Sequence, residues 1–85
     1  MPSKQQVKER LAQLLTEIGK IPRDHISDTA TVDDALQMGS LAFVELQVAL
    51  EEEYHVLIDP VHVVELNEFA AIVDYVHGCA ESAEQ

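Results

Sequence analysis

The sequence is poor in the residues that hold metals and form disulfides. Cys79 is its only cysteine, so no intramolecular disulfide can form, and it follows Gly78 in a polar tail where we expect an inert thiol. The four histidines lack two-ligand helical spacing, so no metal site is expected. No apolar run approaches the roughly 18 residues that span a bilayer, and the first residues lack the apolar core of a signal peptide. We therefore expect a cytoplasmic protein without membrane insertion.

Basic residues are also scarce. Five Lys and Arg face sixteen Asp and Glu, which gives a formal net charge of −11. Because phosphate binding needs clustered Lys and Arg, nucleic acid is not expected as a partner, and partner proteins should carry basic patches. The 85 residues are 47% apolar and contain no Gly, Pro or Ser tract, which indicates one monomeric domain over residues 1–85. We expect an ordered core over about 3–78 and a frayed tail over 79–85.

Apolar residues at three- and four-residue intervals predict a first helix that ends near Ile18. Ser3 is its candidate N-cap, and Gly19 should stop it. The next twenty or so residues show no sustained period. An unstructured connection of that length is uncommon, so the segment is expected to be functional or to contain a short turn, with a candidate at 31–34, where Thr31 and Asp34 fit a capping pattern.

The second half of the chain carries two further start signals. Asp59 followed by Pro60 predicts a short helix. Asn67 is the expected N-cap of a last helix with one apolar face, and Gly78 is its expected end. No segment alternates with period two. The pattern therefore predicts an all-α fold, a four-helix bundle with three longer helices, one short third helix and a long loop between the first and second helices.

The stretch from Gly39 to Tyr54 carries two apolar stripes at helical spacing. Phe43, Leu46, Leu50 and Tyr54 fall on one side, and Leu41, Val44 and Val48 on another. A single core can bury only one stripe. The second is bordered by Glu45, Glu51 and Glu52, so it should form an apolar docking surface in an acidic frame. Ser40, taken alone, would be interpreted as a helix N-cap.

Catalytic motifs are not recognisable: the sequence has no Gly-rich phosphate loop, zinc motif or arguable Ser-His-Asp set. The segment that begins Gly39-Ser40-Leu41 and continues through Val44-Glu45-Leu46 to Tyr54 closely resembles the second helix of acyl carrier proteins, where the motif is Asp-Ser-Leu. The resemblance extends over nearly the whole chain. It includes the amphipathic first helix, the long loop, and single residues or short stretches at Leu36, Ile58 and 71–76.

This resemblance implies a carrier that is not an enzyme. A 4′-phosphopantetheine arm, transferred from coenzyme A to Ser40 by a phosphopantetheinyl transferase, would hold acyl groups as thioesters and present them to acyl-loading and acyl-transferring enzymes with basic docking patches. The matching positions imply a partner-docking face made of Gly39, Leu41, Val44, Glu45, Val48, Glu51 and Glu52.

Three positions depart from the family pattern. Gly39 replaces the usual aspartate, Ala42 stands where many members carry a second acid, and Gln47 occupies a usually apolar position near where an acyl chain can enter between helices. Of the pathways served by the family, these departures favour polyketide, nonribosomal-peptide or modified-lipid biosynthesis over bulk fatty-acid biosynthesis. The alternative is an unmodified, carrier-like acidic adaptor domain for protein-protein interaction.

Overall fold

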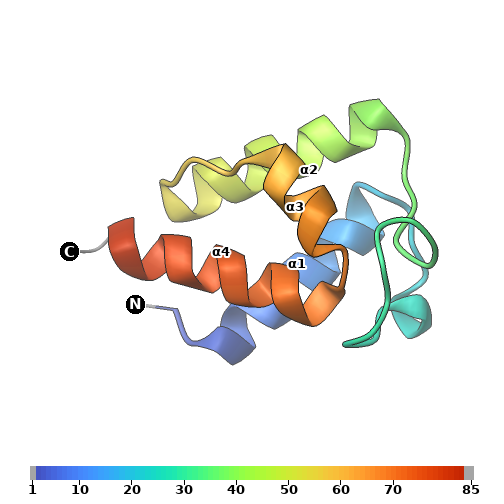
Figure 1. Ribbon diagram of the computed structural model, residues 1–85, viewed down its shortest axis with the longest axis horizontal. Coiled ribbons are helices and arrows are strands. Elements are labelled where there is room, and N and C mark those ends of the chain that lie inside the picture. Colours follow the sequence, from blue (N-terminus) through green and yellow to red (C-terminus); the bar gives the residue numbers. More distant parts are fainter. Residues whose placement is uncertain (1, 84–85) are drawn as a thin grey trace.

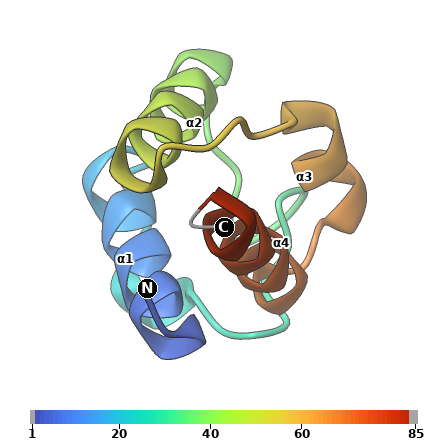
Figure 2. The ribbon, with the colours of Figure 1, turned by 90° about the vertical axis from the view of Figure 1, so that its left-hand side faces the viewer.

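The computed structural model describes residues 2–83, which form four α-helices and one short 3₁₀ helix. These are α1 (Lys4–Glu17), η1 (Arg23–His25), α2 (Ser40–Tyr54), α3 (Pro60–Leu66) and α4 (Phe69–Ala83). In Figure 1, α1, α2 and α4 run along the long axis, and α3 lies between α2 and α4. The end-on view in Figure 2 shows α4 near the middle, with α1, α2 and α3 around it. The prediction of an all-α bundle with a short third helix is confirmed.

The first helix begins as its sequence predicts. The Gln6 N–H donates to Ser3 Oγ at 3.1 Å, and the Ser3 N–H donates to Gln6 Oε1 at 2.7 Å, which completes a capping box. Gly19 follows the C-cap, but it does not take the left-handed conformation, which Lys20 adopts instead with φ 60°. Glycine is required at position 19 because a Cβ there would lie 2.8 Å from the Leu15 carbonyl oxygen.

The long loop is tied down by its apolar residues and by a turn. Ile21, Ala30 and Leu36 are buried in the core. The predicted turn is present, since the Asp34 and Leu36 N–H groups both donate to the Thr31 carbonyl oxygen, at 3.1 and 2.9 Å. The capping detail was wrong, because the Thr31 hydroxyl does not accept from the Asp34 N–H but donates to Asp33 Oδ1 at 2.8 Å. The 3₁₀ turn η1 is an addition that the sequence pattern did not indicate.

The start of α4 corrects the prediction for Asn67. Asn67 ends α3 in a positive-φ conformation (67°) and does not cap α4. The first N–H groups of α4 are satisfied by the loop instead: Phe69 N–H donates to the Ala30 carbonyl oxygen at 2.8 Å, and Ala70 N–H to that of Asp28 at 3.1 Å. Backbone groups distant in sequence therefore replace the expected side-chain cap.

The end of α4 corrects the predicted tail. The helix does not stop at Gly78 but continues to Ala83, so fraying over 79–83 was wrong; residues 84 and 85 lie outside the described residues. The physical reason is burial, since Ala80 is 2% exposed and Cys79 packs against the core. A glycine within a helix costs only about 1 kcal/mol relative to alanine, and apolar contacts on the last turn can offset that.

All four helices and the loop contribute to one core. Its largest fully buried side chains are Phe69, Leu11, Leu36, Val7, Val73 and Val76. Both Leu46 and Leu50 of α2 are buried in it, as the first of the two predicted stripes requires. Over residues 2–83, no helix combines the length and the apolar character needed to cross a membrane. The core therefore uses one side of α2 and leaves the other side to solvent.

Candidate functional site

Ser40 is exposed and is the first residue of α2. The interpretation of Ser40 as the helix N-cap was wrong, because Gly39 occupies that position, with extended backbone angles (φ −65°, ψ 159°), and its carbonyl oxygen accepts from the Phe43 N–H at 3.0 Å. Gly39 has no side-chain oxygen to offer, so no side chain caps the first N–H groups of α2. These groups and the positive end of the helix dipole remain available to an anion or to water beside the Ser40 hydroxyl.

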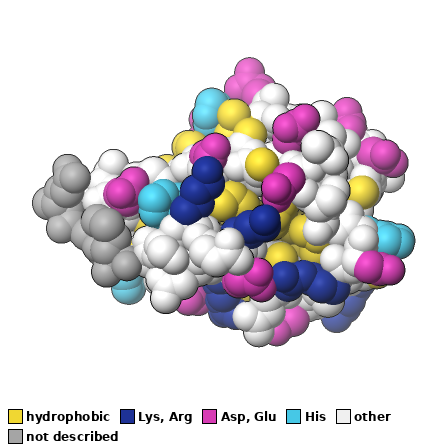
Figure 3. Space-filling model, turned by 90° about the horizontal axis from the view of Figure 1, so that it is seen from below, with side chains coloured by type: hydrophobic (Ala, Val, Ile, Leu, Met, Phe, Trp, Pro, Cys, Tyr) yellow, Lys and Arg dark blue, Asp and Glu magenta, His cyan; other side chains and the backbone are white. Residues whose placement is uncertain are grey.

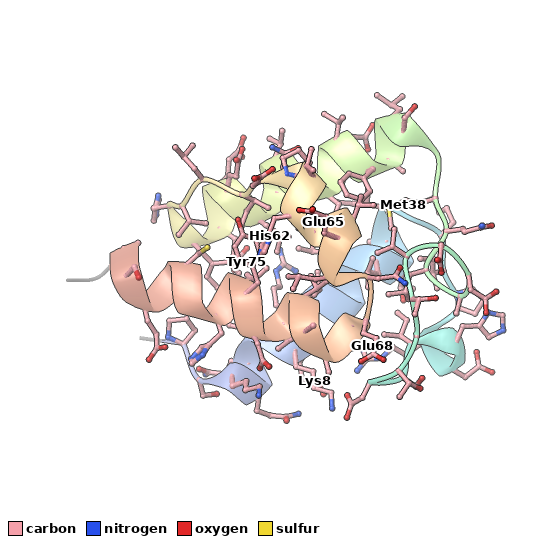
Figure 4. All side chains as sticks on the ribbon, viewed as in Figure 1. Lys8, Met38, His62, Glu65, Glu68 and Tyr75 are labelled. Carbon is pink, nitrogen blue, oxygen red and sulfur yellow. The ribbon has the colours of Figure 1, made fainter. Side chains whose placement is uncertain are left out.

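An open groove starts at Ser40 and runs between α2 and α3. Its lining is almost entirely apolar and consists of Met38, Ser40, Phe43, Val44, Pro60, Val61, Val64 and Glu65. In Figure 4, Met38 and Glu65 mark the loop side and the α3 side of this region. The exposed serine therefore stands at one end of a surface channel that could receive a flexible, largely apolar chain.

The α3 wall of this groove was not predicted. Val61 is 65% exposed and Val64 is 52% exposed, whereas Val63 is buried. A usable signal was present in the sequence, because three valines within four residues of a short helix cannot all face one core. The two exposed valines extend the apolar surface of α2 across the groove.

The second stripe of α2 is on the surface, as predicted. Leu41 is 73% exposed, Val44 52% and Val48 43%. Gly39, Glu45 and Glu52 are also exposed. Ala42, which lies between Gly39 and Glu45 in the sequence, is half-buried. Glu51 differs from its acidic neighbours, because it is half-buried and its Oε2 accepts from the Ile58 N–H at 2.9 Å. The stripe and the exposed part of its acidic frame are thus brought together next to Ser40, and their docking role stays a prediction.

Charge is segregated between the two sides of the molecule. All five Lys and Arg residues lie within the first 23 residues. Within residues 2–83, four of them form ion pairs: Lys4 with Asp74, Lys8 with Asp28 at 3.0 Å, Arg10 with Glu53 at 3.1 Å, and Arg23 with Glu9 at 2.8 Å. Figure 3 shows Lys and Arg gathered with acidic side chains on the face seen from below. The Arg23 guanidinium, hydrogen-bonded to Glu9, lowers the pKa of that carboxyl.

The acidic frame of α2 has no such compensation. Among residues 2–83, no Lys, Arg or His side chain forms a salt bridge with Glu45, Glu51 or Glu52. Neutralised acids on the α1 side contribute little net field, whereas these uncompensated carboxylates give the surface around Ser40 a negative potential. That sign suits a partner with a basic patch.

The thiol and the histidines lie outside this site. Cys79 is not in a polar tail but on α4, half-buried against the core. In Figure 4, His62 of α3 points toward Tyr75 of α4, and their ring centroids are 4.7 Å apart in an edge-to-face arrangement. Within residues 2–83, no three His, Cys, Asp or Glu side chains are grouped so that they could hold a metal ion.

Comparison with known proteins agrees with the geometry. Residues 9–76 match the family model described as the phosphopantetheine attachment site. The chain is also 32% identical, over 81 residues, to an acyl carrier protein of Acidothermus cellulolyticus, and the match covers 95% of this chain and 96% of that protein.

The chain belongs to the acyl carrier protein family, whose members are carriers and not enzymes and hold a covalent 4′-phosphopantetheine. The described residues fit such a group. An exposed hydroxyl stands at a helix N-terminus whose amides can face a phosphate, no atom lies within 4 Å of where a Cβ on Gly39 would be, and an apolar groove leads away from Ser40.

Proposed function

We propose that Ser40 is the attachment site of the 4′-phosphopantetheine arm. The observation that carries the proposal is the exposed hydroxyl on the first residue of α2, next to uncapped N–H groups and at the end of the apolar groove. The Ser40 oxygen would attack the phosphorus that bears the pantetheine of coenzyme A. The new Ser40 O–P bond forms as the P–O bond of the coenzyme A pyrophosphate breaks, the hydroxyl proton passes to a base of the transferase or to water, and adenosine 3′,5′-bisphosphate departs as the other product.

The chain's own residues would then orient the attached group. The N–H groups of the first turn of α2 and the helix dipole would stabilise the phosphodiester. The groove walls, Val44 on one side with Val61 and Val64 on the other, would take the apolar part of the arm. When attached, the arm supplies a thiol that holds acyl groups as thioesters.

Partner enzymes would dock on the face that contains Ser40. The apolar stripe would supply contact area, and the exposed carboxylates of Glu45 and Glu52 would steer basic partners. Because the covalent arm already raises the effective concentration of the acyl group, weak docking is sufficient and partners can exchange rapidly. The partners are a phosphopantetheinyl transferase and enzymes that load or transfer acyl groups.

The departures at Gly39, Ala42 and Gln47 support a specialised carrier. Gly39 and Ala42 remove acidic charge around Ser40, and Gln47 introduces a polar side chain into the lining of the core. We therefore assign the chain to polyketide, nonribosomal-peptide or modified-lipid assembly in preference to bulk fatty-acid synthesis.

The attachment site is tested by intact mass. Coexpression with a promiscuous phosphopantetheinyl transferase should add the mass of one phosphopantetheine to the wild type, and Ser40→Ala should abolish the addition. Ser82→Ala, which removes another exposed serine hydroxyl, is the matched control and should be modified fully. Helical circular dichroism should be the same for all three proteins. Modification at another residue would overturn the assignment of Ser40, and a chain that no transferase modifies would be an unmodified acidic adaptor.

A further inference from the structure

Two side chains of α2 hold the backbone of Ile58 from both sides. Gln47 Nε2 donates to the Ile58 carbonyl oxygen at 3.1 Å, and the Ile58 N–H donates to Glu51 Oε2 at 2.9 Å. Gln47 and Glu51 are four residues apart, so they are neighbours on one face of α2, and their side chains bind the two backbone polar groups of one residue, the N–H and the carbonyl oxygen of Ile58. Both bonds are partly buried. Ile58 directly precedes Asp59, the N-cap of α3, so this grip fixes the entry to α3.

Ile58 lines a small, partly open cavity in the core. Its volume is about 30 Å³, and Gln47 is the one polar residue among its lining residues. A void of this size has room for about one water molecule, which would also need two or more polar partners, and Gln47 is the one polar side chain that the lining offers. Met38 and Phe43 line both this cavity and the open groove at Ser40, so they form the partition between the two. The core, in this arrangement, has no room for an acyl chain.

The helix that would have to move, α3, is held at both ends and, between them, by the edge-to-face contact of His62 with Tyr75 of α4. Val63 is the one buried residue of α3. At its far end, the Val32 N–H donates to the Asn67 carbonyl oxygen at 2.9 Å, and at its near end Ile58 is held by Gln47 and Glu51. A chain that entered the core from the groove would push α3 away from α2. That movement would break the bonds at Ile58 and leave partly buried polar groups without partners.

We propose that Gln47 and Glu51 act as a latch on Ile58 that keeps the carried acyl group out of the core, so that this protein carries short or polar acyl groups in the open groove. The inference rests on the proposed function of Ser40. A short or polar acyl group loses little by remaining in contact with water, whereas a long alkyl chain left in the groove stays largely unburied. Gln47 and Glu51 are therefore positioning residues that determine which cargo is favoured.

The test compares the stability of the protein carrying acyl groups of increasing length. The apo protein is loaded by a promiscuous transferase with acetyl, hexanoyl or dodecanoyl pantetheine from hydrolysis-resistant amide analogues of acyl-coenzyme A. The wild type should unfold at the same temperature with all three groups. Gln47→Leu removes the donor and should gain roughly 4–8 °C from acetyl to dodecanoyl, the shift that about 1 kcal/mol of added stability produces in a domain of this size. The exposed Gln13→Leu is the matched control and should behave like the wild type.

A second measurement needs no loading. In the unmodified protein, amide hydrogen exchange at Ile58 should be at least about tenfold faster in Glu51→Ala, while Glu52→Ala, which removes a neighbouring exposed carboxylate, should leave it unchanged. If amide exchange at Ile58 were unchanged in Glu51→Ala, the latch would be overturned. The same holds if the unfolding temperature of the wild type rose with acyl length as much as that of Gln47→Leu, and neither result would affect the assignment of Ser40. A protein that takes no arm at Ser40 would overturn the proposed function and the latch with it.

Discussion

Gly39 precedes Ser40 at the position where the family resemblance implies an aspartate, and its surroundings leave room for one. Its φ of −65° suits any residue, and a Cβ placed there would meet no atom within 4 Å. An aspartate could therefore adopt the same backbone and accept from the first N–H groups of α2. We expect Gly39→Asp to raise the free energy of unfolding by roughly a few tenths of a kcal/mol, measured by urea unfolding.

The matched control is Gly39→Ala, which adds a Cβ without an oxygen. Alanine is a poorer N-cap than glycine, so this variant should be less stable than the wild type. The functional test compares the wild type with Gly39→Asp. It measures the rate of modification or acyl transfer with a general enzyme and with an enzyme of the protein's own pathway. The negative charge added by Gly39→Asp should raise the rate with the general enzyme and leave unchanged or lower the rate with the cognate one, because specificity is a difference of affinities. Equal effects on both would mean that Gly39 is not a specificity determinant.

At the scale of elements, the prediction succeeded where local sequence decides and failed where distant contacts decide. Periodicity placed α2 and its two stripes, and Ser3 and Asp59 cap α1 and α3 as their sequences indicate. The limits of α4 depend instead on the Ala30 and Asp28 carbonyl groups at one end and on burial of Ala80 at the other. The groove has the same origin, since its α3 wall is set by packing between elements. The carbonyl groups that receive the first N–H groups of α4 leave no local signature, whereas the exposed valines of α3 could have been inferred from three valines within four residues.

The corrected end of α4 leads to a test of stability. Ala80 is 2% exposed, so Ala80→Asp would bury a carboxylate and should lower the free energy of unfolding by about 2–4 kcal/mol. Ser82→Asp places the same charge two residues later on the exposed side of the same helix, and its effect should stay within about 0.5 kcal/mol. Urea unfolding monitored by circular dichroism measures both. Equal, small effects would show that the last turn of α4 contributes nothing to the core.

For the whole molecule, we expect the distribution of charge to govern association with partner proteins. The cations of α1 and η1 are paired with acids, and the pKa of Glu9 is lowered by Arg23. The excess negative charge therefore lies elsewhere, including the α2 frame beside Ser40. The net charge was evident from the sequence, but its distribution depended on which acids the few cations reach across the fold. An acidic face around an exposed apolar stripe favours fast, salt-sensitive association with basic proteins.

Charge reversal on this face should therefore slow association, and apolar truncation should mainly weaken the docked complex. We expect Glu45→Lys and Glu52→Lys to lower kcat/KM for a phosphopantetheinyl transferase by about three- to tenfold at low salt, with a weaker dependence on ionic strength than the wild type. Val44→Ala and Val48→Ala remove contact area, so they should raise KM by faster dissociation and keep the wild-type salt dependence. Glu68→Lys makes the same change in net charge at the exposed start of α4, which Figure 4 shows away from α2, and should have a much smaller effect. If Glu68→Lys slowed modification as much as Glu45→Lys, net charge and not the α2 face would govern docking.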